Sequence, residues 1–169
     1  MEAFANAHRS WSFVGVDPAK PMLDEASKRL ASFTDRVTLV HGFADDAPNG
    51  PFDAATSLLT LHFLNERERL RTVTEIVRRL RPGAPFVAVH CSFPQDPAHR
   101  GVCLDRHEAY SVAAGMDPNV AREGRASIAE SLNALEPEQD ERILTECGLT
   151  NVSLFYAAFT WRGWVGYAQ

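Results

Sequence analysis

The chain has 169 residues, of which 45% are hydrophobic and 23% charged, an ordinary balance for one globular domain with a sizeable core. The formal net charge of −5 gives no electrostatic reason to expect nucleic acid or an anionic membrane as a partner. No apolar run approaches the roughly 20 residues of a membrane-spanning helix, and the N-terminus does not have the pattern of a signal peptide. Three cysteines make no disulfide framework, so we expect a reduced, cytoplasmic protein.

The first part of the chain alternates strand and helix patterns. Residues 13–16 and 37–42 are short and rich in β-branched residues, which predicts two buried strands. The segment between them has apolar residues at helical spacing and charged residues on the other side, which predicts a surface helix. Residues 53–59 follow the turn signals of residues 48–51 and predict a third strand.

The clearest predicted helix runs from Asn65 to Leu80. Asn65 is a suitable N-cap, and Pro82 and Gly83 stop the helix. One apolar stripe is expected to face the core, with the arginines mostly off it. The stripe contains Leu70, Val73, Ile76, Val77 and Leu80, and the arginines are Arg67, Arg69, Arg71, Arg78 and Arg79.

The second part of the chain begins with a predicted strand at residues 86–93. Residues 94–135 are polar and compatible with helix, which predicts a helical insertion. Pro137 suits the first turn of a last helix that ends near Gly148. The chain closes with two β-rich runs, for which we expect a hairpin with its turn at Arg162–Gly163.

These elements together predict an α/β fold over a single domain, residues 1–169. We expect a Rossmann-like, mostly parallel sheet with helices on both faces and a C-terminal antiparallel hairpin.

Asp17 directly follows the first predicted strand. Ligands of open α/β sheets bind beyond the carboxyl ends of the strands, where an acid can accept the hydroxyl groups of a ribose. The same residue could instead cap the helix that begins after Pro18, because aspartate is a good N-cap. The residues alone leave both roles open.

The order and spacing of several segments resemble the class I S-adenosylmethionine (SAM)-dependent methyltransferases over nearly the whole chain. The segments are "VGVDPAKPML" (14–23), "VTLVHGFADDAPNGPFDAAT" (37–56), "LLTLHFL" (58–64), "RRLRPGAPFVAV" (78–89) and the final "LTECGLTNVSLFYAAFTWRGWVGYA". The resemblance implies methyl transfer from SAM to a small-molecule acceptor, with S-adenosylhomocysteine as product. "LLTLHFL", "HCSF" and "AAFTWRGWVGYA" also resemble the carboxy-SAM synthases in part, which implies a modified sulfonium cofactor or a carboxylate substrate as an alternative.

The resemblance also implies roles for individual residues. Asp17 would accept the ribose hydroxyls, and Met22 would lie near the adenine ring, against which a thioether packs well. The turn after the next strand often contains Gly-Asp-Ala in this family, but here Phe43 takes the place of the acid. The adenine amino group would then be bound by Asp45 or Asp46, or not at all, and the Ala44 N–H would bind a ring nitrogen. Leu58 would face the methionine end of the cofactor through its carbonyl.

His62 follows the third predicted strand, where it could orient the substrate or act as a base. The alternative is that it only caps the helix near Asn65. Methyl transfer depends chiefly on positioning the two reactants, so the family often has no dedicated base.

The chain departs from the family pattern at its start. The family normally begins with a strand that ends in a glycine-rich turn, and residues 1–11 resemble the last part of the helix that follows this turn. The missing strand is central in the family sheet, so we expect a gap that its neighbours cannot bridge unless the sheet rearranges. We expect the natural start to lie upstream; the alternatives are an element supplied by a second copy, or loss of the cofactor. Unpaired strand edges also make a homodimer an expectation.

Two other functions are weaker hypotheses. A zinc site would need ligands among His90, Cys91, His99, Cys103 and His107, but no Cys-x2-Cys is present. Cys91 would need a lowered pKa to act as a nucleophile. The main alternative to an enzyme is a non-catalytic methyltransferase-like remnant or interaction module; a dehydrogenase-like nucleotide binder suits the final hairpin less well.

Overall fold

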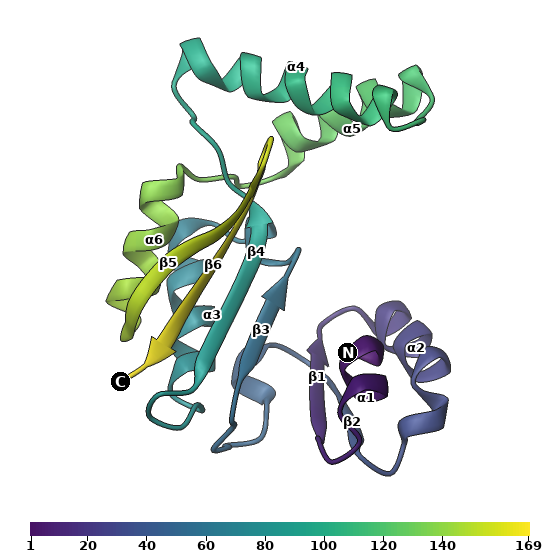
Figure 1. Cartoon of the computed structure of the whole chain (residues 1–169), viewed down its shortest axis with the longest axis vertical. Helices are drawn as coiled ribbons and strands as arrows, with labels where there is room; N and C mark the ends of the chain where they lie inside the picture. The colour runs from purple at the N-terminus through teal and green to yellow at the C-terminus, as the bar shows by residue number, and fades with distance from the viewer. The chain divides into compact units, whose positions relative to one another are not determined.

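The computed structural model describes residues 1–169 and divides into two compact units, Met1–Gly50 and Pro51–Gln169 (Figure 1). Each unit has a sheet of its own, so each is described by itself below.

Unit 1 contains a two-stranded parallel sheet with helices beside it. Its elements are α1 (Glu2–Ala7), β1 (Phe13–Asp17), α2 (Lys20–Arg29), η1 (Ala31–Phe33), β2 (Val37–His41) and η2 (Ala44–Asp46). Phe13 pairs with Val37 and Asp17 with His41, so both strands end at the same edge of the sheet. The β-branched residues predicted both strands, and the helical pattern between them predicted α2.

Arg36 connects α1 and the following turn to the start of β2. Its guanidinium donates hydrogen bonds to the backbone carbonyls of Ala5, His8 (3.0 Å) and Trp11 (2.9 Å), and it lies 5.1 Å from the ring centroid of Phe33. A planar group with several N–H donors can bind several carbonyls at once. A single side chain therefore fixes the N-terminal segment onto the β1–β2 pair.

Unit 2 is built on a mixed four-stranded sheet in the order β3–β4–β6–β5. β3 (Ala55–Leu58) and β4 (Pro85–Cys91) are parallel, whereas β5 (Leu149–Ala158) and β6 (Trp161–Ala168) form an antiparallel hairpin next to β4. The connecting elements are η3 (Leu61–Phe63), α3 (Glu66–Val77), α4 (Pro97–Ala113), α5 (Pro118–Ser131) and α6 (Pro137–Glu146).

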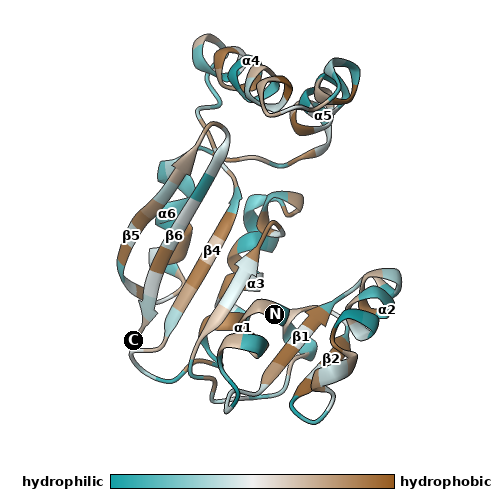
Figure 2. Cartoon of the chain, turned by 45° about the vertical axis from the view of Figure 1, so that its right-hand side comes forward, coloured by the Kyte–Doolittle hydropathy of each residue, from teal (hydrophilic) through white to brown (hydrophobic).

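The core of unit 2 lies between the sheet and two helices, α3 and α6. Phe86 and Ala88 of β4 and Trp164 of β6 point to the same face, where they pack with Val73 of α3 and Leu144 of α6. Each of these side chains is 2% exposed or less. The apolar stretch of β4 is visible in Figure 2. Alternation along β4 thus sends its even-numbered residues, including His90, toward α3 and α6.

The insertion forms a helical pair, α4 and α5, beyond the strand ends of unit 2 (Figure 1). Leu104 of α4 and Ile128 of α5 pack with Cys91 and Phe93 in a second apolar cluster. Asp96 and Asp117 cap the two helices by accepting N–H groups from their first turns. Arg125 of α5 forms an ion pair with Asp105 of α4 at 2.7 Å.

Several local predictions are confirmed. Asn65 caps α3 in a reciprocal capping box with Glu68, Pro137 is the first residue of α6, and Gly148 follows that helix with φ +91°. The α/β fold class is also confirmed, although the larger sheet is mixed rather than parallel throughout. β1 and β2 form a sheet separate from the other strands, as the gap in the family pattern predicted.

Two predictions are wrong in detail. The hairpin turns at Phe159–Thr160, while Arg162 and Gly163 lie inside β6. Phe159 takes φ +53°, and Gly163 is needed in the strand because a Cβ there would lie 3.0 Å from the Phe155 ring. Two of the predicted outward arginines are buried: Arg69 of α3 is 1% exposed, and Arg79, which follows the end of α3 at Val77, is 3% exposed.

No helix of the structure is both long enough and apolar enough to cross a membrane.

Candidate functional site

Asp17 lies at the carboxyl edge of the β1–β2 sheet, where the sequence predicted it. Its Oδ1 accepts the Ala19 N–H at 2.7 Å, and its backbone carbonyl accepts the Gly42 N–H at 3.1 Å. The first bond closes a local turn before α2, but Asp17 is not the N-cap of that helix: the N-cap is Ala19, and no side chain caps the helix. The carboxylate still has lone pairs for a ligand, because two oxygens offer about four acceptor sites. The turn-forming bond and ligand binding are therefore compatible.

The turn after β2 brings the next predicted residues to the same edge of unit 1. Gly42 has φ +155°, and a Cβ there would lie 2.3 Å from Oδ2 of Asp46, so only glycine fits. Asp46 Oδ2 accepts the Phe43 N–H at 2.8 Å. The carboxylate of Asp46 is thus turned back onto the chain, and Asp45 beside it is also exposed, so both remain candidates for binding an adenine amino group.

Ala44 begins η2, and the first N–H groups of a helix have no partner within it. This N–H is therefore suited to the predicted bond with a ring nitrogen. Phe43 and Met22 are large apolar side chains, yet they are 63% and 58% exposed. Exposed apolar side chains beside a carboxylate suit the binding of a flat, partly apolar ring.

In unit 2, Leu58 is the last residue of β3, and its carbonyl accepts the Thr60 hydroxyl at 3.1 Å. Leu59 follows with φ +60°, a conformation that costs a side-chain-bearing residue about 1–2 kcal/mol. Its N–H still donates to Val89 of β4 at 2.7 Å. The strained residue turns the chain from β3 into η3, and both leucines are about half exposed. Strain of this kind is common at ligand sites.

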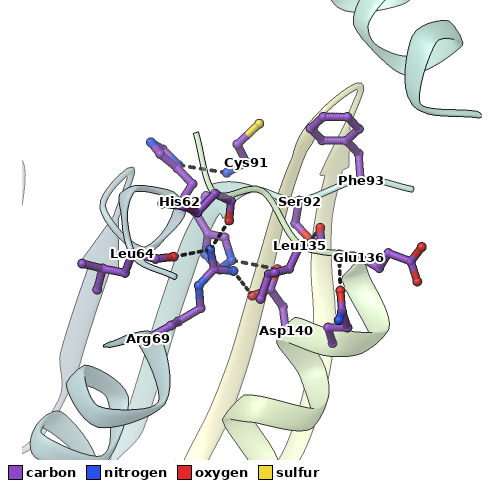
Figure 3. A network of polar contacts seen from close by, with 12 residues as sticks. His62, Leu64, Arg69, Cys91, Ser92, Phe93, Leu135, Glu136 and Asp140 are labelled. Atoms are coloured by element: carbon purple, nitrogen blue, oxygen red, sulfur yellow. Dashed lines mark hydrogen bonds and ion pairs between the residues drawn. The ribbon is translucent and has the colours of Figure 1, made fainter. Parts of the chain in front are cut away.

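His62 of η3 is 3% exposed and is held at the end of β4. Its Nδ1 accepts the backbone N–H of Cys91 at 3.1 Å (Figure 3). Its carbonyl accepts the Asn133 N–H at 2.8 Å. The ring makes edge contacts with Phe63 and Trp161, at centroid distances of 4.5 and 5.7 Å. His62 therefore does not cap α3, because Asn65 does. Instead, its Nδ1 binds the backbone N–H of β4 that lies just beyond the end of β3.

The pKa of His62 is lowered to about 4, chiefly by burial and also by the neighbouring positive charges of His90 and Arg69. The imidazole is accordingly neutral at physiological pH. Burial also raises the pKa of the Cys91 thiol to about 11, against a smaller opposing effect of the Thr160 hydroxyl. A thiol with so high a pKa carries almost no thiolate, so Cys91 is not an activated nucleophile.

Below His62 lies a buried ion-pair network that the sequence did not reveal (Figure 3). Arg69 of α3 donates to Asp140 of α6, and to the Asn133 and Leu64 carbonyls at 2.7 and 3.3 Å. His90 Nε2 lies 3.1 Å from Asp140 Oδ2, within ion-pair distance but not aligned for a hydrogen bond. Each of these three side chains is 1% exposed.

The network affects the charge state of Asp140 and the position of η3. Burial alone would raise the pKa of Asp140, but His90 and Arg69 outweigh it and hold the pKa below the usual value. Arg69 binds the Leu64 carbonyl just after η3 and the Asn133 carbonyl at the end of the insertion, so it fixes the segment that carries His62. A signal was present in the sequence: Arg69 lies four residues before Val73, on the core-facing stripe.

Other groups near His62 come from the insertion and the hairpin. His107 of α4 shares a hydrogen bond with the fully buried Thr160 hydroxyl at 3.0 Å, and its ring lies 6.2 Å from that of Trp161. Trp161 therefore contacts imidazoles from both η3 and α4. We refer to His62, Cys91, His107, Thr160 and Trp161 as the strand-end cluster. No group of His, Cys, Asp and Glu in the chain is arranged to hold a metal ion.

Comparison with known proteins shows what the chain is similar to. Residues 1–83 match the family model of the methyltransferase domain. The carboxy-S-adenosyl-L-methionine synthase of Actinobacillus succinogenes is 24% identical over 152 residues, which cover 88% of this chain and 62% of the relative. The chain thus spans less than two thirds of that relative's length.

Solved structures show the same fold at low sequence identity. An O-methyltransferase family protein from Burkholderia thailandensis superposes with a TM-score of 0.71 and 14% identity, over 99% of this chain and 47% of that one. PigF with SAH gives a TM-score of 0.67 and 15% identity, over 97% of this chain and 45% of the other. The comparisons together support assignment to the class I SAM-dependent methyltransferases, which the sequence resemblance predicted.

Proposed function

We propose that the chain carries out SAM-dependent methyl transfer to a small-molecule acceptor, with unit 1 holding the adenosine part of the cofactor. The edge of the β1–β2 sheet carries the proposal: it combines a carboxylate with open acceptor sites, an unpaired helix-start N–H and exposed apolar side chains. The family match to residues 1–83, which includes all of unit 1, supports it independently.

In this proposal Asp17 accepts the ribose hydroxyls, because an ionised carboxylate forms strong hydrogen bonds with paired hydroxyl groups. Met22 and Phe43 contact the adenine ring, the Ala44 N–H donates to a ring nitrogen, and Asp45 or Asp46 accepts the amino group. The cofactor supplies a methyl group on a positively charged sulfur, and the acceptor attacks it in line. The protein contributes mainly the relative position of the two reactants. The contact of Leu58 with the methionine end stays a prediction from the resemblance.

The test is calorimetric titration of the 169-residue chain with S-adenosylhomocysteine. Asp17→Ala removes a charge-assisted hydrogen bond, so we expect binding to weaken about 10- to 100-fold. Asp53→Ala is the matched control, because Asp53 is 80% exposed and pairs only with Arg81 at the surface of unit 2. Wild-type protein that is folded but gives a flat titration would contradict the proposal and favour the non-catalytic alternative.

The curated relatives bear the name of carboxy-SAM synthases, so the form of the cofactor needs its own measurement. We propose that SAM itself is bound. Competition of SAM and carboxy-SAM for the S-adenosylhomocysteine site compares the two forms directly. Tighter binding of the carboxylated form would redirect the proposal to that cofactor.

A further inference from the structure

The backbone of β4 determines which nitrogen of His62 carries the proton. The N–H groups of Val89 and Cys91 lie on the same edge of β4, because alternate residues of a strand face the same side. β3 makes its last contact there when Leu59 donates to the Val89 carbonyl, and the next N–H, that of Cys91, is beyond its reach. His62 Nδ1 accepts that N–H instead.

A backbone N–H can only donate, so Nδ1 of His62 must be the unprotonated nitrogen. In a neutral imidazole the proton then resides on Nε2. Protonating Nδ1 would break this bond and leave the N–H of fully buried Cys91 without a partner, which is costly. The tautomer is therefore fixed by the fold and does not depend on a ligand.

The Nε2 of His62 has no partner in the protein. Both ring nitrogens of His90 are buried without a hydrogen-bond partner, whereas Nε2 of His62 is not among the polar atoms that are buried in this way. The ring as a whole is 3% exposed, so the small accessible part includes this N–H. A buried side chain thus presents one fixed donor, with Phe63 and Trp161 beside it as aromatic neighbours.

We propose that His62 binds the methyl acceptor through Nε2–H as a fixed donor and is not a general base. The acceptor in this proposal is an aromatic compound with an anionic oxygen, either a phenolate or a carboxylate. This rests on the proposed methyl transfer. A base at this position would need a free lone pair on Nε2, and the structure leaves none. His62 therefore cannot take a proton from the acceptor, and its fixed N–H donor matches an acceptor that is already anionic at neutral pH, such as a phenolate or an aromatic carboxylate.

The charged groups around the ring agree with a neutral donor. Arg69 of α3 and His90 of β4 oppose a further positive charge on His62, and burial acts in the same direction. Cys91 stays a neutral thiol, and burial also lowers the pKa of His107 on α4, across Trp161. No carboxylate contacts the ring to favour imidazolium.

The first test reads the tautomer without any ligand. Long-range proton–nitrogen NMR spectra of the full-length chain, recorded from pH 5 to 8, should show His62 with Nδ1 unprotonated and Nε2 protonated throughout. An Nδ1-protonated tautomer, or titration of His62 within that range, would overturn the proposal. The spectra need no cofactor, so this result is independent of the S-adenosylhomocysteine titration that tests the proposed function.

The second test separates the two hydrogen bonds of His62: the one that Nε2–H donates to the acceptor and the one that Nδ1 accepts from the Cys91 N–H. Asn places its amide near the position of Nδ1, so His62→Asn keeps an acceptor for Cys91 but removes the Nε2 donor. Gln places its amide near Nε2, so His62→Gln keeps the donor and removes the base. The probes are 4-nitrophenol, whose absorbance distinguishes phenol from phenolate, and benzoate. Thermal unfolding confirms that both variants are folded.

Wild type should bind at least one probe in its anionic form. His62→Gln should bind it within about threefold of wild type, and His62→Asn should bind it about 10-fold to 100-fold more weakly, since one hydrogen bond to a charged group is lost. Binding of 4-nitrophenol as the neutral phenol, equal binding by His62→Asn and wild type, or no saturable binding of either probe would overturn the proposal. The two probes distinguish phenolate from carboxylate as the source of the oxygen.

Discussion

At the scale of single residues, unit 2 depends on buried charges that satisfy each other. Arg69 and Asp140 join α3 to α6, and the remaining guanidinium donors bind backbone carbonyls near η3. A buried pair of this kind adds little net stability over an apolar core, but loss of one partner leaves the other charge unpaired. The network therefore positions the segments around His62 more than it stabilises the fold.

Asp140→Asn tests this network. The substitution leaves Arg69 charged and buried, so we expect a loss of about 3–5 kcal/mol in the free energy of unfolding. Asp105→Asn is the control, because Asp105 is 68% exposed and its ion pair with Arg125 should contribute no more than about 1 kcal/mol. Urea unfolding of the two variants gives the comparison, and equal losses would contradict the structural account.

The lowered pKa of His62 makes stability depend on pH. The unfolded chain takes up a proton near the ordinary pKa of 6.5, whereas folded His62 does so only near 4. The contribution of His62 to the free energy of unfolding is therefore fully present above pH 6.5, and it is lost as the pH falls from 6.5 toward 4. His62→Asn does not titrate, so its melting temperature should fall less than that of wild type between pH 7 and 4.5. Parallel curves would show that His62 is not held neutral.

At the scale of elements, the C-terminal hairpin shows how packing decides the position of a turn. Phe159 takes a left-handed conformation and stacks on Tyr110 of α4, at a centroid distance of 4.5 Å. Arg162–Gly163 has the composition of a turn, but Gly163 is buried in β6 because the neighbouring strand comes too close for a side chain. Glycine is required at position 163 because β5 lies so close to β6 there, and not because the chain reverses direction at this residue.

A pair of glycine substitutions tests this assignment. Gly163→Ala would place a Cβ at 3.0 Å from the Phe155 ring and 3.1 Å from Cβ of Tyr156, so we expect a loss of about 1–3 kcal/mol. Gly101→Ala, inside α4 with no atom within 4 Å of the added Cβ, should instead gain about 0.5–1 kcal/mol from helix propensity. Thermal unfolding should give opposite signs for the two variants. A neutral Gly163→Ala would argue for a turn there.

At the scale of the whole molecule, the two units differ in how their sheets are supported. Unit 2 has a four-stranded sheet with an extensive buried core, whereas unit 1 has two strands, and every residue of β1 is half-buried. Two-stranded sheets are marginally stable unless something else packs on them. The chain spans about half the length of the solved structures that it resembles, so the activity of the full family fold remains a proposal for it.

Hydrogen exchange tests the difference between the units. We expect the amides of β1 and β2 to exchange much faster than those of β4 and β6, because less buried apolar surface holds the first pair closed. S-adenosylhomocysteine should slow exchange at the ends of β1 and β2 if unit 1 binds it. Mass spectrometry of peptides over these strands measures both effects. Equal protection of all four strands without ligand would show that β1 and β2 gain additional partners, as the expected homodimer could supply.

The sequence by itself determined the features that depend on nearby residues. The alternation of β-branched runs and helical stripes gave the order of the elements, and Asn65, Pro137 and Gly148 marked helix ends through the local chemistry of caps. The placement of Asp17 at the end of a strand was also a local matter. The roles of Met22, Phe43, Ala44, Asp45 and Leu58 came from the family resemblance and stay predictions.

Only the tertiary structure decided the features that depend on residues far apart in the chain. Arg69 is buried because Asp140, 71 positions later, lies opposite it. Position 163 requires glycine because the Phe155 ring occupies the space beside it. His62 accepts the Cys91 N–H through Nδ1 because β3 ends before it reaches Cys91 of β4. Local periodicity records which face of an element is apolar, but the partner that a polar group meets on that face is set by packing between elements.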